Sequence, residues 1–426
     1  MTNKKIFIII IVFLLLSLNL FSSIQSKSSS KSYLNLEFKL KEKSIMITAS
    51  SSYEYGLKIG EKYRIKYKLL DFFTSFSRNN NIDKNFIKAQ LNSLENYCPE
   101  YIEELEGLSA STNIRLERLF EIQILLSKIF GGHCTVTLST GPATKNNQTF
   151  VSQNWDASAR GLYKYLIRLC TFTPHIRRIG TNYRYVYIGI PILEEIFLMN
   201  EKGLCWCGTE TSLTKNESRY IDEGEGIPIY FLERKTMETC KNISEVAELW
   251  KTSNRSADKN KEFPNKYDFG TAGWADREGG ILYIEQSHNH ILCVYGNSTD
   301  ITNTSEGILW HSLHHIWIDP NLTGSKTPEE HPLSVLKTDR AKELLEEYYG
   351  NITVDVLKSI CRDHGGGFDP NKPDPADICW HPTKDHPYVT TISWIAQPKE
   401  LTLYWTHRQP CKSFYWKHDF SRIFRN

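Results

Sequence analysis

The sequence predicts an α+β fold in which β-sheets pack together and are covered by helices. Three observations lead to this prediction. Apolar side chains before Cys134 recur with helical spacing, the chain after Cys134 changes to short alternating runs, and further helical stretches interrupt these runs. Because each sheet must bury a face against another layer, this order of helices and strands favours stacked sheets with helices outside.

The segment from residue 27 to 133 is predicted to be mainly helical. Tyr55, Ile59 and Tyr63 mark the apolar side of the first long helix, and we expect the aromatic side chains of this region to form core. Helices are expected over residues 53–76, 83–96, 101–108 and 116–129.

The segment from residue 134 to 426 is predicted to be rich in strands and to form one domain together with residues 27–133. Strand-like runs occupy residues 135–138, 149–151, 163–172, 183–191, 196–199, 203–209, 269–275, 281–286, 291–295, 389–395 and 401–405. Helices are expected at residues 227–240, 244–252, 334–349 and 353–363, and a turn at residues 200–203.

Residues 1–26 resemble a secretory signal peptide. Lys4 and Lys5 supply the positive start, residues 6–21 form an almost unbroken apolar run, and Ser22, Ser23 and Ser26 offer small residues for cleavage. The apolar run is short for a membrane span, although an uncleaved anchor is the alternative. No later segment is long and apolar enough to cross a bilayer, so we expect a soluble chain in the secreted, lysosomal or endosomal space.

Glycosylation signals agree with that location. Eight asparagines begin an Asn-x-Ser/Thr sequence, which predicts a glycosylated surface: Asn147, Asn216, Asn242, Asn254, Asn297, Asn303, Asn321 and Asn351.

The cysteines define no metal site by their spacing. An oxidising compartment permits disulfides, but their pairing cannot be deduced from sequence. No CxxC pair or zinc-like spacing occurs, and His311 and His314 lack a third ligand signature, so neither a metal nor a cofactor is expected. If Cys134 is free, at least one other of the ten must also be unpaired: Cys98, Cys134, Cys170, Cys205, Cys207, Cys240, Cys293, Cys361, Cys379 and Cys411.

The most informative stretch surrounds Cys134. A small-residue turn, Gly131 and Gly132, precedes His133 and Cys134, which leads into a strand-like run. A loop over residues 140–148 then returns the chain to a second run that ends in the polar cluster 153–156. Two paired strands would bring the Cys134 thiol and the Asp156 carboxylate toward each other at one end of a sheet.

This arrangement is expected of a cysteine that becomes a chain end when the His133–Cys134 bond is cut. The new α-amine has a pKa of about 7.7–8 and can take the thiol proton and return it to a leaving amine. Cys134 can make the cut itself by an N-to-S acyl shift onto the His133 carbonyl, which water then resolves. A structural buried cysteine is the alternative, because that is the commonest fate of a free thiol.

The chain resembles the acyl-CoA:6-aminopenicillanic acid acyltransferase-like family of cysteine N-terminal-nucleophile hydrolases. The matching segments keep their order between residues 53 and 415. They are Tyr55-Gly56 with Gly60, Glu104 to Leu108 with Leu116 and Leu119, Cys134-Thr135, Gln153 to Asp156, Met199 to Leu204, Gly226 to Pro228 with Arg234, Asp276 with Gly279 and Glu285, Ile378-Cys379, and Gln409 to Cys411.

The resemblance implies a four-layer αββα sandwich, autocleavage before Cys134, and chemistry on linear amide or thioester acyl groups. Cys134 would carry the acyl group, and Asp156 would support the nucleophile and the autocleavage. The substrate would be a small amide or acyl compound, and the formal net charge of +2 gives no argument for nucleic acid. Nothing in the sequence defines an oligomeric state.

Two segments depart from the family's pattern. Leu313 stands where the family's H-T-N-H motif has an asparagine that donates into the oxyanion hole, and losing one such donor typically costs about 100- to 1000-fold in rate. His314, His315 or a backbone N–H could compensate. In Asp377-Ile378-Cys379-Trp380, Asp377 and Trp380 replace the serine and the arginine of the family's S-I-C-R segment.

The sequence is therefore compatible with three functions. The first is an autoprocessed cysteine amidohydrolase or acyltransferase, with hydrolysis favoured because a lumenal enzyme meets water readily. The second is a lumenal thiol hydrolase acting on lipid amides or phospholipids. The third is a non-catalytic glycoprotein that retains the fold, as the Leu313 and Trp380 departures would allow.

Overall fold

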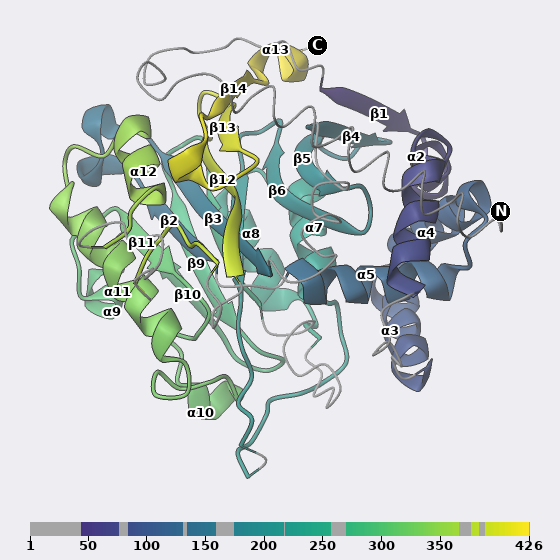
Figure 1. The fold of residues 1–426 in the computed structure, drawn as a ribbon, viewed down its shortest axis with the longest axis horizontal. Helices are drawn as coiled ribbons and strands as arrows, with labels where there is room; N and C mark the ends of the chain where they lie inside the picture. Colours follow the sequence, from purple (N-terminus) through teal and green to yellow (C-terminus); the bar gives the residue numbers. More distant parts are fainter. Residues whose placement is uncertain are drawn as a thin grey trace, which may run out of the picture. The chain divides into compact units, whose positions relative to one another are not determined.

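Two β-sheets form the centre of the structure (Figure 1). A computed structural model describes residues 44–75, 84–130, 134–158, 174–216, 218–256, 270–365, 376–382 and 388–425, all within the unit Leu40–Asn426. The larger sheet has the order β1-β4-β5-β6-β7-β8-β9-β10 and the smaller one β11-β2-β3-β12-β13-β14. All neighbouring strands are antiparallel except β1 and β4, which are parallel.

The strands of the larger sheet are β1 (Ile45–Ala49), β4 (His175–Ile179), β5 (Tyr185–Ile190), β6 (Glu194–Asn200), β7 (Cys205–Glu210), β8 (Gly270–Ala275), β9 (Ile281–Gln286) and β10 (Ile291–Tyr295). Those of the smaller sheet are β2 (Thr135–Ser139), β3 (Phe150–Ser158), β11 (Ile308–His311), β12 (Tyr388–Gln397), β13 (Thr402–Thr406) and β14 (Trp416–Asp419).

The two sheets pack face to face, with β2 and β3 against β7 and β8. A polar clamp joins them at the centre. The Gln153 side-chain amide donates to the Gly208 carbonyl at 2.8 Å and accepts from the Gly208 N–H at 3.1 Å. Because the N–H and C=O of Gly208 are both paired with the Gln153 amide, burying this polar side chain between the sheets costs little free energy.

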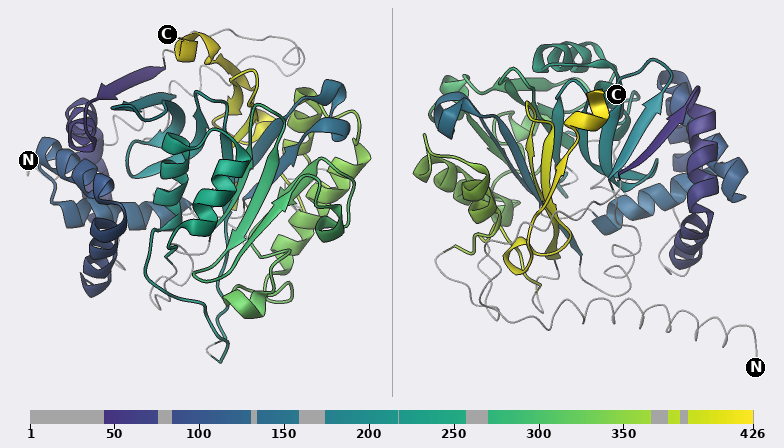
Figure 2. Two further views of the ribbon diagram at one scale, coloured as in Figure 1. Left: turned by 180° about the vertical axis from the view of Figure 1, so that it is seen from behind. Right: turned by 90° about the horizontal axis from the view of Figure 1, so that it is seen from above.

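Helices cover the outer faces of both sheets. Helices α11 (Pro332–Glu347) and α12 (Val354–Cys361) pack on the smaller sheet, whereas α7 (Ile229–Thr239) and α8 (Ile243–Thr252) pack on the larger one (Figure 2). The predicted α+β fold and its αββα layering are therefore confirmed. The short helices are α9 (Thr299–Thr302), α10 (Pro320–Thr323), α13 (Ser421–Arg425) and the 3-10 turns η2 (Gly141–Ala143), η3 (Lys145–Asn147) and η4 (Pro410–Lys412).

A helical group precedes Cys134, as predicted. It comprises α2 (Ser52–Ser75), α3 (Lys84–Tyr97), α4 (Pro99–Thr112) and α5 (Leu116–Phe130). Helices α2 and α4 cross in direct backbone contact, because a Cβ atom at Gly56 would lie 2.0 Å from the Glu104 carbonyl oxygen. Glycine at this position is thus a packing requirement.

A buried ionic network joins these helices to the larger sheet. Glu104, fully buried on α4, lies 2.6 Å from Arg177 of β4 and 2.7 Å from Arg234 of α7. Burial alone would raise the pKa of Glu104, but the two guanidinium groups outweigh it and lower that pKa. Glu104 and Arg234, both noted in separate segments of the sequence, therefore meet in space.

The structure corrects several boundaries and adds strands. The cluster 153–156 was expected to end a short strand, but β3 continues through it to Ser158 because its polar side chains find buried partners. Strands β1, β4, β11 and β14 were not predicted. The expected strand at residues 163–172 and the expected signal peptide lie outside the described residues. No helix within the described ranges is long and apolar enough to span a membrane.

Candidate active site

Cys134 immediately precedes β2, at the end of the smaller sheet. Ser312 Oγ donates to the Cys134 carbonyl oxygen at 2.9 Å, and Thr135 pairs with Asn154 of β3, so Cys134 lies beside the end of the 153–156 cluster. The backbone N–H of Asp156 lies near enough to the Cys134 sulfur to lower the pKa of the thiol. The strand pairing therefore brings thiol and aspartate together as the sequence predicts.

The Cys134 thiol is held in its neutral form in the uncleaved chain. Its side chain is only 4% exposed, and this burial raises its pKa well above the usual value. The negative charge of Asp156 raises the pKa further, and the hydrogen bond from the Asp156 N–H opposes the rise. A thiol in this state is a weak nucleophile until a base or a cation appears beside it.

Asp156 is fully buried and makes two strong contacts through its carboxylate. Lys337 Nζ lies 2.5 Å from Oδ2, and Thr390 Oγ1 donates to Oδ1 at 2.6 Å. Burial raises the pKa of Asp156, while the charge and hydrogen bond of Lys337 oppose that rise. Since a turn-capping aspartate would be exposed at a strand end, the burial and the ion pair set Asp156 apart from that alternative.

Lys337 is the residue near the site that the sequence analysis missed. It is fully buried on α11, and its ammonium group lies 4.5 Å from the centre of the Trp380 ring. A signal was present in the sequence. The buried side of α11 follows helical spacing, and Lys337 occupies one of the positions normally taken by an apolar side chain: Ser334, Lys337, Thr338, Ala341, Leu344 and Leu345.

Backbone contacts hold the surroundings of Asp156 in place. Thr390 Oγ1, which donates to Asp156, accepts from the Trp380 N–H at 2.8 Å, and the Thr390 N–H donates to the Trp380 carbonyl at 3.1 Å. Asn154 Nδ2 donates to the carbonyls of Cys361 at 2.8 Å and Ile378 at 2.9 Å. The segment around Ile378 and Trp380 is thus tied to β3 and β12.

Leu313, the residue in place of the family's oxyanion donor, offers no donor from its backbone. Its N–H already donates to Ser334 Oγ at 2.7 Å, and its side chain is buried. His311 is paired with Glu285 at 2.8 Å and stacks on Tyr283. Both ring nitrogens of His311 therefore have partners within the core, as in a structural histidine.

His314 and His315 are neutral at physiological pH. Burial lowers the pKa of each to about 4. His314 Nδ1 lies 2.8 Å from Ser334 Oγ, and His315 Nδ1 lies 3.0 Å from Thr323 Oγ1. A neutral imidazole that accepts through Nδ1 carries its proton on Nε2, which is the form that an oxyanion donor requires. Their predicted role in an oxyanion hole stays a prediction.

The remaining predicted site residues are placed as follows. His133 lies outside the described residues. Seven of the eight predicted glycosylation asparagines are exposed, and Asn242, which caps α8, is half-buried. Their modification itself stays a prediction. The nine cysteines that the structure describes carry free thiols.

One cluster of potential metal ligands was not predicted from the sequence. His364, Cys379, His381 and Cys411 bring their ligand atoms within 4.8 Å of one another. The expectation of no metal site rested on sequence spacing, and the spacing was uninformative because the four residues come from three separate segments.

Comparisons with known proteins give structural similarity only. Two structures of conjugated bile acid hydrolase from Clostridium perfringens, a mutant and a variant, align at 13% and 14% identity over 68% and 67% of this chain and 93% of theirs, with a TM-score of 0.39 for both. Penicillin V acylase from Agrobacterium tumefaciens aligns at 11% identity over 68% of this chain and 87% of its own, with a TM-score of 0.40. No family model and no curated protein matches the sequence. At this identity the likeness assigns neither a family nor an activity to this chain.

Proposed function

We propose that this protein is a self-cleaving cysteine hydrolase or acyltransferase whose nucleophile is Cys134, acting on linear amide or thioester acyl groups. The observation that carries the proposal is the pairing of β2 with β3, which places the Cys134 thiol beside Asp156. We further propose that the mature protein is secreted or lysosomal and glycosylated, in keeping with its apolar first residues and exposed sequons.

Maturation would use the thiol against its own chain. The Cys134 sulfur attacks the His133 carbonyl carbon, the thiol proton passes to the Cys134 nitrogen, and the C–N bond breaks. The acyl group is then held on sulfur as a thioester, and the nitrogen of Cys134 has become an amine. Water then hydrolyses the thioester and releases the thiol. This route needs no residue beyond those at the strand end.

Turnover would then use the new α-amine as the base. The amine takes the thiol proton, the thiolate attacks the substrate carbonyl, and the proton passes to the leaving amine. The buried Asp156 carboxylate would stabilise the protonated amine, and Lys337 would limit the excess negative charge that Asp156 brings to the thiolate.

N-terminal sequencing of the purified full-length product tests the proposal. We expect two fragments, the larger beginning at Cys134. The Cys134→Ala variant should remain a single chain, while the control Cys293→Ser, at another free and incompletely exposed cysteine, should be processed normally. An intact wild-type chain after maturation would reject the mechanism.

Substrate screening defines the acyl class. The wild-type protein should release amine from simple N-acyl amines, and Cys134→Ala should lose this activity by at least about a thousandfold. Activity confined to lipid amides would instead support the lipid-amidase alternative, and a processed chain without turnover on either class would support the non-catalytic one.

A further inference from the structure

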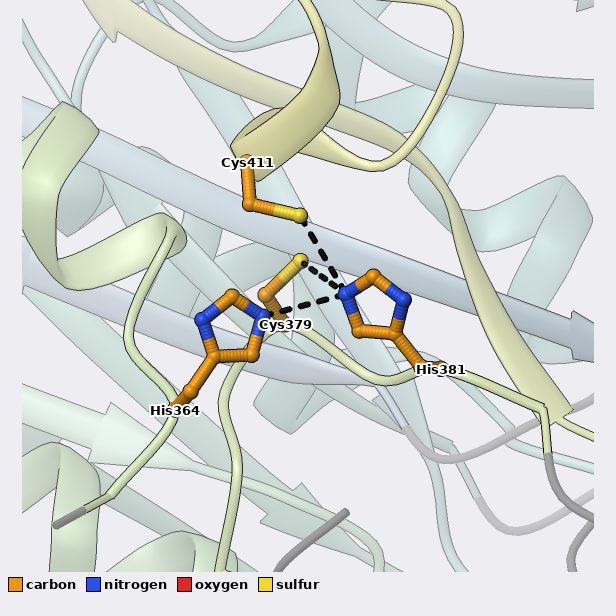
Figure 3. Close-up of side chains that lie close together, drawn as sticks. All are labelled: His364, Cys379, His381 and Cys411. Carbon is orange, nitrogen blue, oxygen red and sulfur yellow. Dashed lines mark hydrogen bonds between the residues drawn. The ribbon is translucent and has the colours of Figure 1, made fainter. Parts of the chain in front are cut away.

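We propose that His364, Cys379, His381 and Cys411 bind one Zn²⁺ ion in a closed structural site. These side chains converge from three segments of the chain (Figure 3). His364 follows α12, Cys379 and His381 flank Trp380, and Cys411 lies in η4. The inference does not depend on the proposed function.

The three separations that involve His381 Nε2 fit a tetrahedral ion. His381 Nε2 lies 3.1 Å from His364 Nε2, 3.2 Å from Cys411 Sγ and 3.9 Å from Cys379 Sγ. With zinc bonds of about 2.0–2.1 Å to nitrogen and about 2.3 Å to sulfur, tetrahedral geometry requires about 3.3 Å between two nitrogens and about 3.6 Å between nitrogen and sulfur. The observed separations differ from these values by only a few tenths of an ångström.

The ligand chemistry selects zinc. Two thiolates and two imidazoles in a tetrahedral arrangement are typical of structural zinc sites, whereas calcium and magnesium prefer oxygen ligands. Because all four positions are filled by protein side chains, no position is left for a substrate or water. The site is therefore structural in kind.

The burial of the cluster also fits a metal. Cys379 and His381 are buried, and His364 and Cys411 are partly covered. Two imidazole nitrogens face each other at 3.1 Å beside two sulfur atoms, so their lone pairs point into one small volume.

The backbone around the ligands is held by hydrogen bonds that do not involve the ligand atoms. The Cys379 N–H donates to the Asp363 carbonyl at 3.0 Å, which joins the segments that carry Cys379 and His364. Arg340 clamps the Asp363 carboxylate with bonds of 2.8 and 3.0 Å. Arg362 donates to the Pro410 carbonyl at 2.9 Å, next to Cys411. The ligands are thus pre-positioned.

Gln409 lies where it can fix the ligating nitrogen of His381. Its amide nitrogen Nε2 is 2.9 Å from His381 Nδ1. Turning this amide by half a rotation exchanges its nitrogen and oxygen, so that Nδ1–H donates to Gln409 and His381 Nε2 is left free to bind the ion. This is the usual way in which a protein fixes the ligating nitrogen of a histidine.

A disulfide between Cys379 and Cys411 is the competing state, and the experiment separates the two. The full-length wild-type protein, purified without added metal or chelator, should contain about one zinc per chain by mass spectrometry of the metal. Cys411→Ser and His364→Ala should each lower the zinc content at least about fivefold, while Cys293→Ser should leave it unchanged.

A second measurement keeps the test independent of whether the variants fold. Titration of the wild-type protein with a mercurial reagent should release zinc as Cys379 and Cys411 react, and cobalt substitution should give the charge-transfer absorption of a thiolate-bound tetrahedral ion. Wild-type protein with negligible zinc, or peptide mapping that finds a Cys379–Cys411 disulfide, would overturn the proposal. So would zinc that persists in Cys411→Ser.

Discussion

Replacing Lys337 by methionine tests the electrostatic design of the candidate site. The change keeps the length of the side chain but removes the cation 2.5 Å from the buried Asp156 carboxylate. Breaking a buried pair in this way typically costs about 3–5 kcal/mol. The protein can limit this cost by protonating Asp156. Protonation costs about 1.36 kcal/mol for each pH unit by which the solution pH exceeds the unfolded pKa of about 3.9.

The pH dependence of the free energy of unfolding follows from the direction in which the pKa of Asp156 shifts once Lys337 is removed. A carboxylate whose pKa is raised in the fold destabilises the fold above that pKa, and the penalty disappears as the pH falls toward the unfolded pKa. Lys337→Met should therefore lower the free energy of unfolding by about 3–4 kcal/mol at pH 7 and by no more than about 1.5 kcal/mol at pH 5.

Urea denaturation of uncleaved protein, in the Cys134→Ala background, measures these values. Lys358→Met is the matched control, because Lys358 pairs with the 90% exposed Asp355, and it should cost less than about 1 kcal/mol at both pH values. Adding Asp156→Asn to Lys337→Met should recover more than half of the loss. A loss below about 1 kcal/mol at pH 7, or an equal loss at both pH values, would refute the reasoning.

Two further predictions concern groups whose pKa is shifted. In the uncleaved chain, Cys134 should react with iodoacetamide at least about 100-fold more slowly than a free thiol, because burial raises its pKa. The alkylation rate should rise after cleavage, and rapid labelling of the uncleaved chain would contradict the prediction. Glu104→Gln, which leaves Arg177 and Arg234 without their shared carboxylate, should cost about 3–5 kcal/mol at pH 7. Since the pKa of Glu104 is lowered, this difference between wild type and variant should persist above about pH 4.3 and shrink as the pH falls further, and a pH-independent difference in urea unfolding would contradict it.

The layered fold was predictable because most elements show a clear period in the sequence. Strand β9 was predicted with its observed bounds, and α2 within one residue at each end. The unpredicted β4 has the sequence His-Ile-Arg-Arg-Ile, and one of its arginines, Arg177, is buried. Its burial depends on Glu104 and Glu238, which lie far away in sequence, so no local pattern could indicate it.

The site was predictable only where sequence neighbours carry the chemistry. Cys134 immediately precedes β2 and Asp156 lies on β3, the next strand, so their proximity follows from one hairpin. Lys337 and Thr390 reach Asp156 from a helix and a strand much later in the chain. The proposed zinc ligands could not be predicted from the sequence for the same reason: they lie far apart in the chain, and only folding brings Cys411 to His364.

The two segments that depart from the pattern of the resembled family meet at helix α11, and this bears on the choice between the proposed hydrolase and the non-catalytic alternative. Ser334 of helix α11 accepts a hydrogen bond from the Leu313 N–H. One turn later on the same helix, Lys337 lies against the Trp380 ring and forms an ion pair with Asp156. Burying a lysine and a carboxylate costs several kcal/mol of desolvation for each ion, and well-packed apolar residues would often be at least as stable. Unlike the buried network of Glu104, this pair lies next to a thiol, and the charges of both Asp156 and Lys337 act on the pKa of Cys134. The position of the pair therefore supports the proposed hydrolase over the non-catalytic alternative.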